Sequence, residues 1–564
     1  MKFSEYKYER PDLEQVQKLY ADYIDELKEA QDADKFMIVF NKLNQMRNHI
    51  TSMKTIASLR YTINTADEFY EKENDYWDEY SPFYQQLDTR LYKTIMESDL
   101  LNELKKRIPS TFFGIISCQL KAFDDAIMED LQQENRVATQ YDKLKASAKI
   151  EFEGKIYNLP GISALCESKD RELRKKASEA KFKFYEEHEA EFDRIYDELV
   201  QVRDRMAKKL GFKNFTELGY LRMTRLDYDE NMVADYRKEV LENVVPLACE
   251  LVKRQKERLC LDKMEYYDLN VEFESGNPTP KGHCKELVEK ARQMYHELSK
   301  ETGEFFDMMI DRELLDLESK PNKAGGGYCS YISEYESPFV FSNFNGTSGD
   351  VDVLTHEAGH AFQVYSSRHH AIPELEFPTY ESCEIHSMSM EFITWPWSHL
   401  FFGEDTAKYH FLHLSSAVKF LPYGVLVDHF QHEVYNHPHM TPQERKATWR
   451  KLEKMYLPYK NYEGCDFLER GNYWFQQSHI FSDPFYYIDY TLAQACSLQF
   501  WKRCQEHDPD MWKDYVAICK AGGTQSFLEI VRTAHLTSPF ERGSLKEIVD
   551  FVKIYLDNVD DKKL

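Results

Sequence analysis

The stretch His356-Glu357-Ala358-Gly359-His360 constrains this chain more than any other, because HExxH residues on a helix create a metal site. On a helix, His356 and His360 fall one turn apart on the same face, so both imidazoles can bind one ion. Glu357 then lies beside them, placed to take a proton from a metal-bound water. Zn²⁺ suits this arrangement because it lowers the pKa of its water. The motif therefore predicts one zinc ion per chain and hydrolytic chemistry of the zinc peptidase type.

A catalytic zinc site also needs a third protein ligand and an open position for water. The segment 379–393 (TYESCEIHSMSMEFI) carries Glu381, Glu384 and Glu391 on one helical face in otherwise apolar surroundings. Carboxylates in such a helix are costly to bury unless they are paired or bound to a metal. We therefore predict Glu384 as the third ligand, with Glu381 and Glu391 supporting the ligands. His386 points elsewhere at helical spacing and is predicted to be a packed core histidine.

A second group of candidate catalytic residues lies far downstream. His479 precedes Tyr486, Tyr487 and Tyr490, and Pro484 is placed to begin a helix between them. Tyr486 and Tyr490 fall on one helical face at i, i+4. When water attacks a peptide carbonyl, negative charge grows on the carbonyl oxygen, and neutral O–H or N–H donors stabilise it. We therefore expect His479 and these tyrosines to stabilise the oxyanion.

Other polar residues near these motifs are expected to be structural. Asp352 lies one turn before His356, where a carboxylate at a helix start is favoured, although it is also placed to orient a ligand histidine. Four further histidines do not follow the spacing of a zinc site and are expected to be structural or to face solvent, namely His429, His432, His437 and His439.

The charge balance argues against two classes of partner. The chain has 72 Lys and Arg against 97 Asp and Glu, a formal net charge of −25, which disfavours nucleic acid and anionic membrane surfaces. No apolar run long enough for a membrane-spanning helix is present, and the charged start MKFSEYKYERPDLEQ lacks the apolar core of a signal peptide. The 11 cysteines are scattered without the short spacings of a disulfide framework. We therefore expect a cytoplasmic protein without nucleic-acid or membrane partners.

The hydrophobic periodicity predicts a mainly α fold in two regions. An N-terminal helical region, 1–190, is expected to contain a short β-hairpin near 149–159, where residues alternate around Glu153-Gly154. A helical catalytic region, 191–564, is expected to carry the zinc site. Within them the pattern predicts helices over 163–210, 230–262, 286–317 and from 348 onward, and short strands at 327–332 and 337–344.

Several sequence blocks, in the same order, resemble the thimet oligopeptidase/oligoendopeptidase F family of zinc metallopeptidases. The similarity is greatest to the bacterial oligoendopeptidase F (Pz-peptidase-like) branch and concentrates in the C-terminal two-fifths of the chain, while residues 1–190 match only in helical character. The blocks are AKKLGFKNF (207–215), GGGYCSYI (325–332), PFVFSNFNGTSGDV (338–351), HEAGHAFQ (356–363), ESCEIHSMSMEF (381–392), LPYGVLVDHFQHEVY (421–435), HIFSDPFYYIDY (479–490) and LTSPF (536–540).

The resemblance implies a multi-helical zincin-type oligopeptidase that encloses a deep substrate channel, with a small β-sheet next to the active-site helix. It implies that Zn²⁺ binds His356, His360 and Glu384 and that Glu357 is the general base. It also implies oligopeptides as substrates, because a deep channel admits short peptides and excludes folded proteins.

The same resemblance implies roles for the downstream residues. His479, Tyr487 and Tyr490 correspond to residues that bind the substrate carbonyl and the oxyanion. The spacing between the histidine and the tyrosines is shorter here than in the thimet branch, so Tyr486 and Tyr487 both stand as candidates.

These observations predict a cytoplasmic zinc endopeptidase that hydrolyses short oligopeptides by Glu-assisted attack of zinc-bound water. Two alternatives are a helical zinc carboxypeptidase, which also carries HExxH in a helical shell, and a non-catalytic peptide-binding protein on the same fold. The sequence carries no signal for the oligomeric state.

Overall fold

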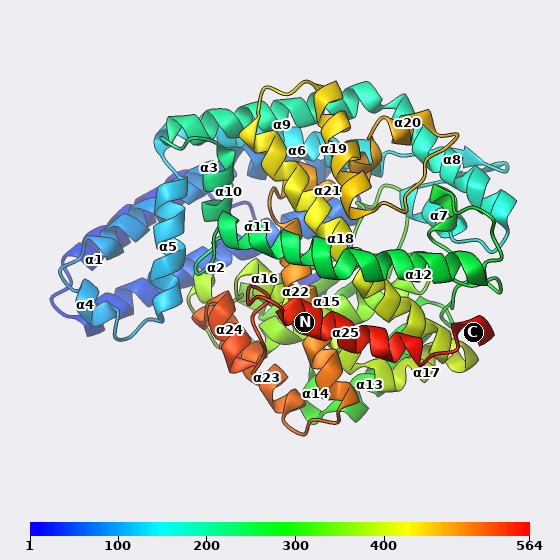
Figure 1. The fold of residues 1–564 in the computed structure, drawn as a ribbon. Coiled ribbons are helices and arrows are strands. Elements are labelled where there is room, and N and C mark those ends of the chain that lie inside the picture. Colours follow the sequence, from blue (N-terminus) through cyan, green and yellow to red (C-terminus); the bar gives the residue numbers. More distant parts are fainter.

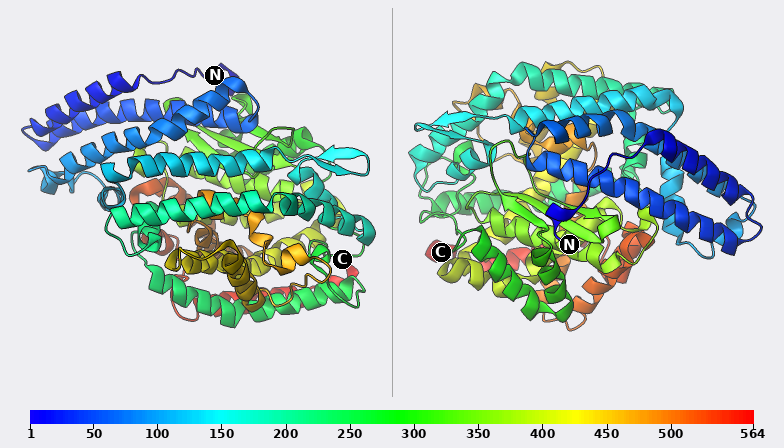
Figure 2. Two further views of the ribbon diagram at one scale, coloured as in Figure 1. Left: turned by 90° about the horizontal axis from the view of Figure 1, so that it is seen from above. Right: turned by 180° about the vertical axis from the view of Figure 1, so that it is seen from behind.

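A computed structural model describes residues 1–564 and confirms the predicted mainly α fold (Figure 1). In the N-terminal part, Asp12 caps the first long helix by accepting a hydrogen bond from the backbone N–H of Gln15. Several of these first helices project as an arm from one side of the body (Figures 1 and 2). The helices are α1 (Leu13–Lys28), α2 (Ala33–Ile63), α3 (Glu68–Met96), α4 (Leu101–Leu104), α5 (Ser110–Ala122) and α6 (Met128–Ala146).

The predicted hairpin comes directly after α6. Strands β1 (Ile150–Phe152) and β2 (Lys155–Tyr157) pair antiparallel, with Phe152 opposite Lys155. Glu153 and Gly154 join them and have positive φ angles of 49° and 76°. Two residues with positive φ make the tight turn whose twist matches that of the strands.

The predicted helix over 163–210 is divided into three helices. Asp170 causes one of the breaks, because its carboxylate caps the next helix by accepting from the backbone N–H groups of Glu172 and Leu173. Gly211 ends the last of them with a φ of 84°. A π-helical turn, Val240–Val244, likewise divides the predicted segment 230–262. The helices are α7 (Leu159–Leu165), α8 (Arg171–Glu187), α9 (Glu189–Lys209), α10 (Phe215–Arg222), α11 (Glu230–Glu239) and α12 (Val245–Arg258).

The predicted helix over 286–317 is wrong at its end. Helices α13 (Cys284–Leu298) and α14 (Lys300–Asp311) fill most of it, but Leu315–Glu318 form a strand, β3. This short segment has no clear strand pattern of its own and becomes a strand because it pairs in parallel with β5 (Ser337–Phe344).

The two predicted strands complete a three-stranded sheet in the order β3-β5-β4, with β4 (Tyr328–Ile332) antiparallel to β5. The first six residues of β5 are all buried. Helix α15 (Gly349–Ser367), which carries the HExxH motif, packs against β4 and β5. The sheet thus lies next to the active-site helix, as expected (Figure 2).

The rest of the chain is helical, and one apolar core runs through both predicted regions. No helix combines the length and the apolar composition needed to cross a membrane. Helix α16 packs against both α15 and α22. The remaining helices are α16 (Tyr380–Ile393), α17 (Ser398–Phe402), α18 (Thr406–Asn436), α19 (Pro442–Tyr456), α20 (Asp466–Glu469), α21 (Ser478–Ser482), α22 (Tyr487–Gln505), α23 (Met511–Ala521), α24 (Phe527–Thr533) and α25 (Ser544–Asp557).

Gly359 sets the distance between α15 and α16. A Cβ atom at this position would lie 2.7 Å from the Cα of Ser387 and 2.9 Å from the carbonyl oxygen of His386. Both atoms belong to the backbone of α16, so they have no side-chain torsion with which to move away. The glycine inside the HExxH motif therefore allows the two helices to cross close enough for their side chains to meet.

We predict that Gly359→Ala lowers the free energy of unfolding by about 1–3 kcal/mol, the usual cost of overpacking, despite the higher helix propensity of alanine. Chemical denaturation followed by circular dichroism measures the change. Gly325→Ala is the matched control, because a Cβ there meets no atom within 4 Å. Equal stability of the two variants would contradict the proposed role of Gly359.

Candidate metal and active site

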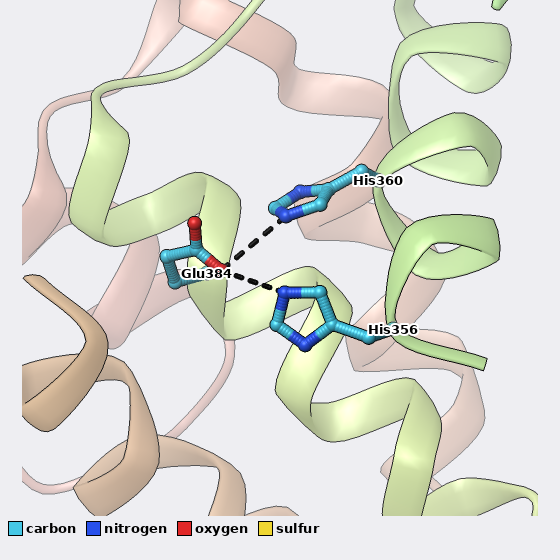
Figure 3. Close-up of side chains that lie close together, drawn as sticks. All are labelled: His356, His360 and Glu384. Carbon is cyan, nitrogen blue, oxygen red and sulfur yellow. Dashed lines mark ion pairs between the residues drawn. The ribbon is translucent and has the colours of Figure 1, made fainter. Parts of the chain in front are cut away.

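Helices α15 and α16 bring the three predicted zinc ligands together (Figure 3). The Oε2 atom of Glu384 lies 3.1 Å from Nε2 of His356 and 3.3 Å from Nε2 of His360. All three donor atoms lie within 4.8 Å of one another. Two imidazoles and a carboxylate converging on one point are the donor set of a catalytic zinc site.

The electrostatics of this cluster favour an ionised carboxylate between the imidazoles. Burial opposes the charge of Glu384, but the two histidines outweigh it and hold the pKa of this carboxyl well below its ordinary value. Ser387 Oγ donates a hydrogen bond of 2.9 Å to Oε2, and the hydroxyl of Tyr486 donates to Oε1. The carboxylate is therefore both charged and fixed in orientation, which suits a metal ligand.

Glu391, predicted to support the ligands, does contact one of them. Its Oε1 atom accepts a hydrogen bond of 2.7 Å from Nδ1 of His356. Its other oxygen accepts one of 2.7 Å from Nε2 of His413, a residue of α18 that sequence reasoning missed. No local pattern marks His413, because it meets Glu391 only where α18 packs beside the end of α16.

Glu381 does not contact the cluster. Its Oε2 atom lies 3.1 Å from Nη1 of Arg225, and the same nitrogen lies 2.5 Å from Oδ1 of Asp489 on α22. Arg225 Nη2 also donates to the carbonyl oxygen of Phe485, at 2.8 Å. This buried group ties the segment after α10 to α16 and α22. Sequence reasoning named Glu381 but missed its pairing with Arg225 and Asp489, because the three residues come from distant segments.

Glu357 is buried beside the ligands, with 4% of its surface exposed. Burial raises the pKa of its carboxyl above the ordinary value, although the neighbouring histidines act in the other direction. Its Oε2 atom has no hydrogen-bond partner in the protein. Its Oε1 atom lies 3.3 Å from where a Cβ on Gly327 would stand, so the glycine leaves room next to the carboxylate. An unpaired buried carboxylate oxygen at this position is suited to accept a proton.

His479 on α21 is held as a neutral donor. Gln477 Nε2 donates to its Nδ1 at 2.9 Å, and Gln477 Oε1 accepts from the hydroxyl of Tyr423 at 2.8 Å. Burial lowers the pKa of His479. The proton of the neutral ring is therefore on Nε2, which lies 3.1 Å from the hydroxyl oxygen of Tyr490.

The three candidate tyrosines occupy different positions around His479. The Tyr486 ring stacks on the His479 ring at 5.5 Å, and its hydroxyl reaches Glu384. Tyr486 and Tyr490 are both half-buried, whereas Tyr487 is only 9% exposed and packs edge-on against His479 and Tyr423. The hydroxyl groups of Tyr486 and Tyr490 thus have hydrogen-bond partners in the site, while Tyr487 is buried against the ring of His479.

The start of the tyrosine helix differs from the prediction. Pro484 does not begin it; α22 begins at Tyr487, with Tyr486 as its capping residue. Phe485 interrupts the chain with a φ of 70°, a strained value for an aromatic residue. Its backbone N–H donates to Gln431 Oε1 at 2.9 Å, which helps to hold this conformation.

The remaining predicted residues behave as structural groups. His386 is fully buried and donates from Nδ1 to the carbonyl oxygen of Ser382. Asp352 lies in the first turn of α15 and accepts a hydrogen bond of 2.6 Å from the hydroxyl of Tyr409 on α18. It does not bond His356 or His360. The histidines of 429–439 form no metal cluster, and His432 instead lies 3.1 Å from the Tyr220 hydroxyl.

A cavity of about 430 Å³ lies next to the candidate site, and its volume is typical of ligand-binding sites. Phe420 and Tyr423 line it and also pack against Tyr487. Side chains from α8, α12 and the segment 457–476 form much of its wall. The cavity supports the predicted interior channel.

The fold and the cluster together define a helical metallopeptidase scaffold with an HExxH helix and a glutamate-bearing helix. The sequence model of peptidase family M3 matches residues 164–550, and that of the peptidase M3 N-terminal domain matches residues 3–123. The first match covers more than half of the chain, so the protein belongs to peptidase family M3.

Individual relatives agree with this assignment. A solved structure of PZ peptidase A with an inhibitor superposes with a TM-score of 0.99 at 51% identity, and the match covers 100% of both chains. Oligoendopeptidase F of Lactococcus lactis subsp. cremoris is 24% identical over 35% of this chain and 32% of its own length. Oligopeptidase PepF of Bacillus subtilis is 21% identical over 66% of this chain and 55% of its own length. The alignments to these curated relatives thus span about a third to a half of their lengths.

Proposed function

We propose that this protein is a zinc-dependent endopeptidase that hydrolyses peptide bonds in short oligopeptides. The observation that carries the proposal is the unpaired buried oxygen of Glu357 beside the cluster of His356, His360 and Glu384. The 11 free cysteines support a reducing compartment, and we propose the cytoplasm.

The residues of the cluster fit a zinc ion. Nε2 of each histidine and the ionised carboxylate of Glu384 would hold it, because these are ordinary zinc donors and their atoms already converge. When bound, Zn²⁺ lowers the pKa of a water molecule and polarises a carbonyl group.

Glu357 is the proposed general base. Its free Oε2 atom would accept the proton of the attacking water and then return it to the leaving amine. Burial raises the pKa of this carboxyl, which brings its basicity closer to the neutral range in which both transfers are needed. The neighbouring Gly327 keeps the space next to the carboxylate open.

The opposite wall of the site supplies neutral donors. His479 presents its Nε2–H and Tyr490 its hydroxyl, and the two atoms lie 3.1 Å apart. Donors of this kind stabilise the negative charge that develops on the carbonyl oxygen during water attack. They need no change of protonation, since burial lowers the pKa of His479.

The sheet offers a way to hold a peptide in extended form. Strand β4 is an edge of the sheet and lies beside α15. A substrate chain can add to such an edge by main-chain hydrogen bonds, which recognise a peptide without regard to its side chains. The adjoining cavity would receive the residues on one side of the scissile bond.

We predict that Glu357→Gln leaves zinc bound but lowers kcat by several orders of magnitude, because the amide cannot accept the proton. Zinc content by atomic absorption and cleavage of an internally quenched peptide measure the two effects. A chelator should abolish cleavage by the unsubstituted protein, and added Zn²⁺ should restore it. Near-normal turnover of the variant would remove Glu357 as the base, and the absence of any chelator-sensitive cleavage by the unsubstituted protein would support the non-catalytic alternative.

Blocking the substrate's C-terminus distinguishes an endopeptidase from a carboxypeptidase. We predict that peptides with a free carboxylate and their amidated counterparts are cut at the same internal bonds with kcat/KM values within a few-fold, since main-chain binding along β4 does not use the terminus. Mass spectrometry of the products identifies the cut bonds. Loss of cleavage on amidation would favour the carboxypeptidase.

The tyrosines should differ in their effects. We predict that Tyr490→Phe lowers kcat about 10²- to 10³-fold, the usual cost of removing one oxyanion donor, while Tyr487→Phe has a smaller effect because that side chain lies behind His479. Steady-state kinetics on one peptide, with zinc content measured for each variant, makes the comparison. A larger loss for Tyr487→Phe than for Tyr490→Phe would reverse the assignment.

A further inference from the structure

A hydrogen-bonded chain of three side chains, Glu391, His413 and Trp395, leads away from His356, a proposed metal ligand. Trp395 Nε1 donates to His413 Nδ1 at 3.0 Å, and His413 Nε2 donates to Glu391 Oε2 at 2.7 Å. Glu391 Oε1 accepts from His356 Nδ1, also at 2.7 Å. The four residues come from α15, α16, α18 and the short helix Trp395–Trp397.

The chemistry of these groups permits only one direction of hydrogen bonding. An indole N–H can only donate, so His413 Nδ1 must be the acceptor, and its ring proton must be on Nε2. A carboxylate can only accept, so both histidines donate to Glu391. The ring proton of neutral His356 is then on Nδ1, which leaves the lone pair of Nε2 facing Glu384.

We propose that His413, held by Trp395, is a positioning residue that keeps His356 in the tautomer required to bind the metal. It acts through Glu391, whose carboxylate it fixes in orientation. This inference rests on the proposed zinc-dependent function and adds to it a residue from a third helix.

Packing makes this arrangement rigid. The His413 side chain is 7% exposed and Trp395 is 4% exposed. The His413 ring stacks on Tyr409 at 5.5 Å and contacts Phe392 at 4.6 Å. A flip of the ring would keep these contacts but would break the hydrogen bonds to Trp395 and Glu391, so packing and hydrogen bonding together fix which nitrogen faces Glu391.

The neighbouring His410 provides a matched control. His410 lies on α18, the helix that carries His413, and its ring stacks on that of Trp395. The ring centroids are 4.2 Å apart and the ring planes differ by 6°. The Nε2 atom of His410 faces the carbonyl oxygen of Trp395 at 3.3 Å and does not reach Glu391. A change at His410 therefore disturbs the same packing but leaves the hydrogen-bond chain in place.

The test is a zinc titration of the metal-free, full-length protein against a competing chromophoric chelator. We expect His413→Phe, which keeps a ring but removes the donor, to weaken zinc binding about 10- to 100-fold. His413→Gln, whose amide places an N–H near the same position, should recover most of the affinity. His410→Phe should bind zinc like the unsubstituted protein. Trp395→Phe, which removes only the indole N–H, should lie between the unsubstituted protein and His413→Phe.

Two results would overturn the inference. One is unchanged zinc affinity in His413→Phe. The other is an equal loss of zinc affinity in His410→Phe and His413→Phe, which would show a packing effect. Thermal unfolding of the metal-free variants would then show an equal loss of stability. At saturating zinc, His413→Phe should recover most of its kcat, since the proposed role of His413 is to hold His356 in the metal-binding tautomer.

The titration separates this inference from the proposed hydrolysis. An unsubstituted protein that binds zinc but cleaves no peptide would refute the proposed function, while the affinities of the His413 variants would still decide the positioning role. An unsubstituted protein that binds no zinc would refute both.

Discussion

The buried carboxylate of Glu384 is the interaction on which the rest of the site depends. An ionised carboxyl with almost no exposure costs several kcal/mol to bury unless partners compensate it. Its partners, His356 and His360, lie on another helix, so the compensation is available only if α15 and α16 cross closely. Gly359 makes that crossing possible because its missing Cβ leaves room for the backbone of α16. The motif thus supplies both the histidines of the proposed metal site and the space that they need.

Around this centre the structure pairs further buried charges instead of avoiding them. Arg225 joins Glu381 to Asp489, and Glu391 joins His356 to His413. Each group bridges elements that are distant in the sequence, so the helices that carry ligands and donors are tied by directional contacts as well as by apolar packing. Removing Arg225 would leave the carboxyl groups of Glu381 and Asp489 without their cation in the interior, which is far more costly than losing a surface ion pair.

Local sequence pattern predicted much of the fold and the residues that converge in the candidate metal site. Helical periodicity predicted most of the helices, and the alternation around Glu153-Gly154 predicted the hairpin. The spacing within 379–393 placed Glu384 and Glu391 on one face, where both meet α15. Strand β3 was missed because its four residues become a strand only by pairing with β5. Arg225 and His413 were missed for the same reason, since their partners lie in other segments of the chain.

Positions that depend only on spacing along one helix follow from the amino-acid sequence alone. The sequence puts His356 one turn from His360 and Glu357 beside them, because backbone geometry alone sets those positions. Which tyrosine hydroxyls face the cluster depends instead on how α22 packs against α16 and on the strained turn at Phe485, and both are set by long-range packing. Long-range packing also decides the tautomer of His356, because that proton is placed by a carboxylate and a histidine from two other helices.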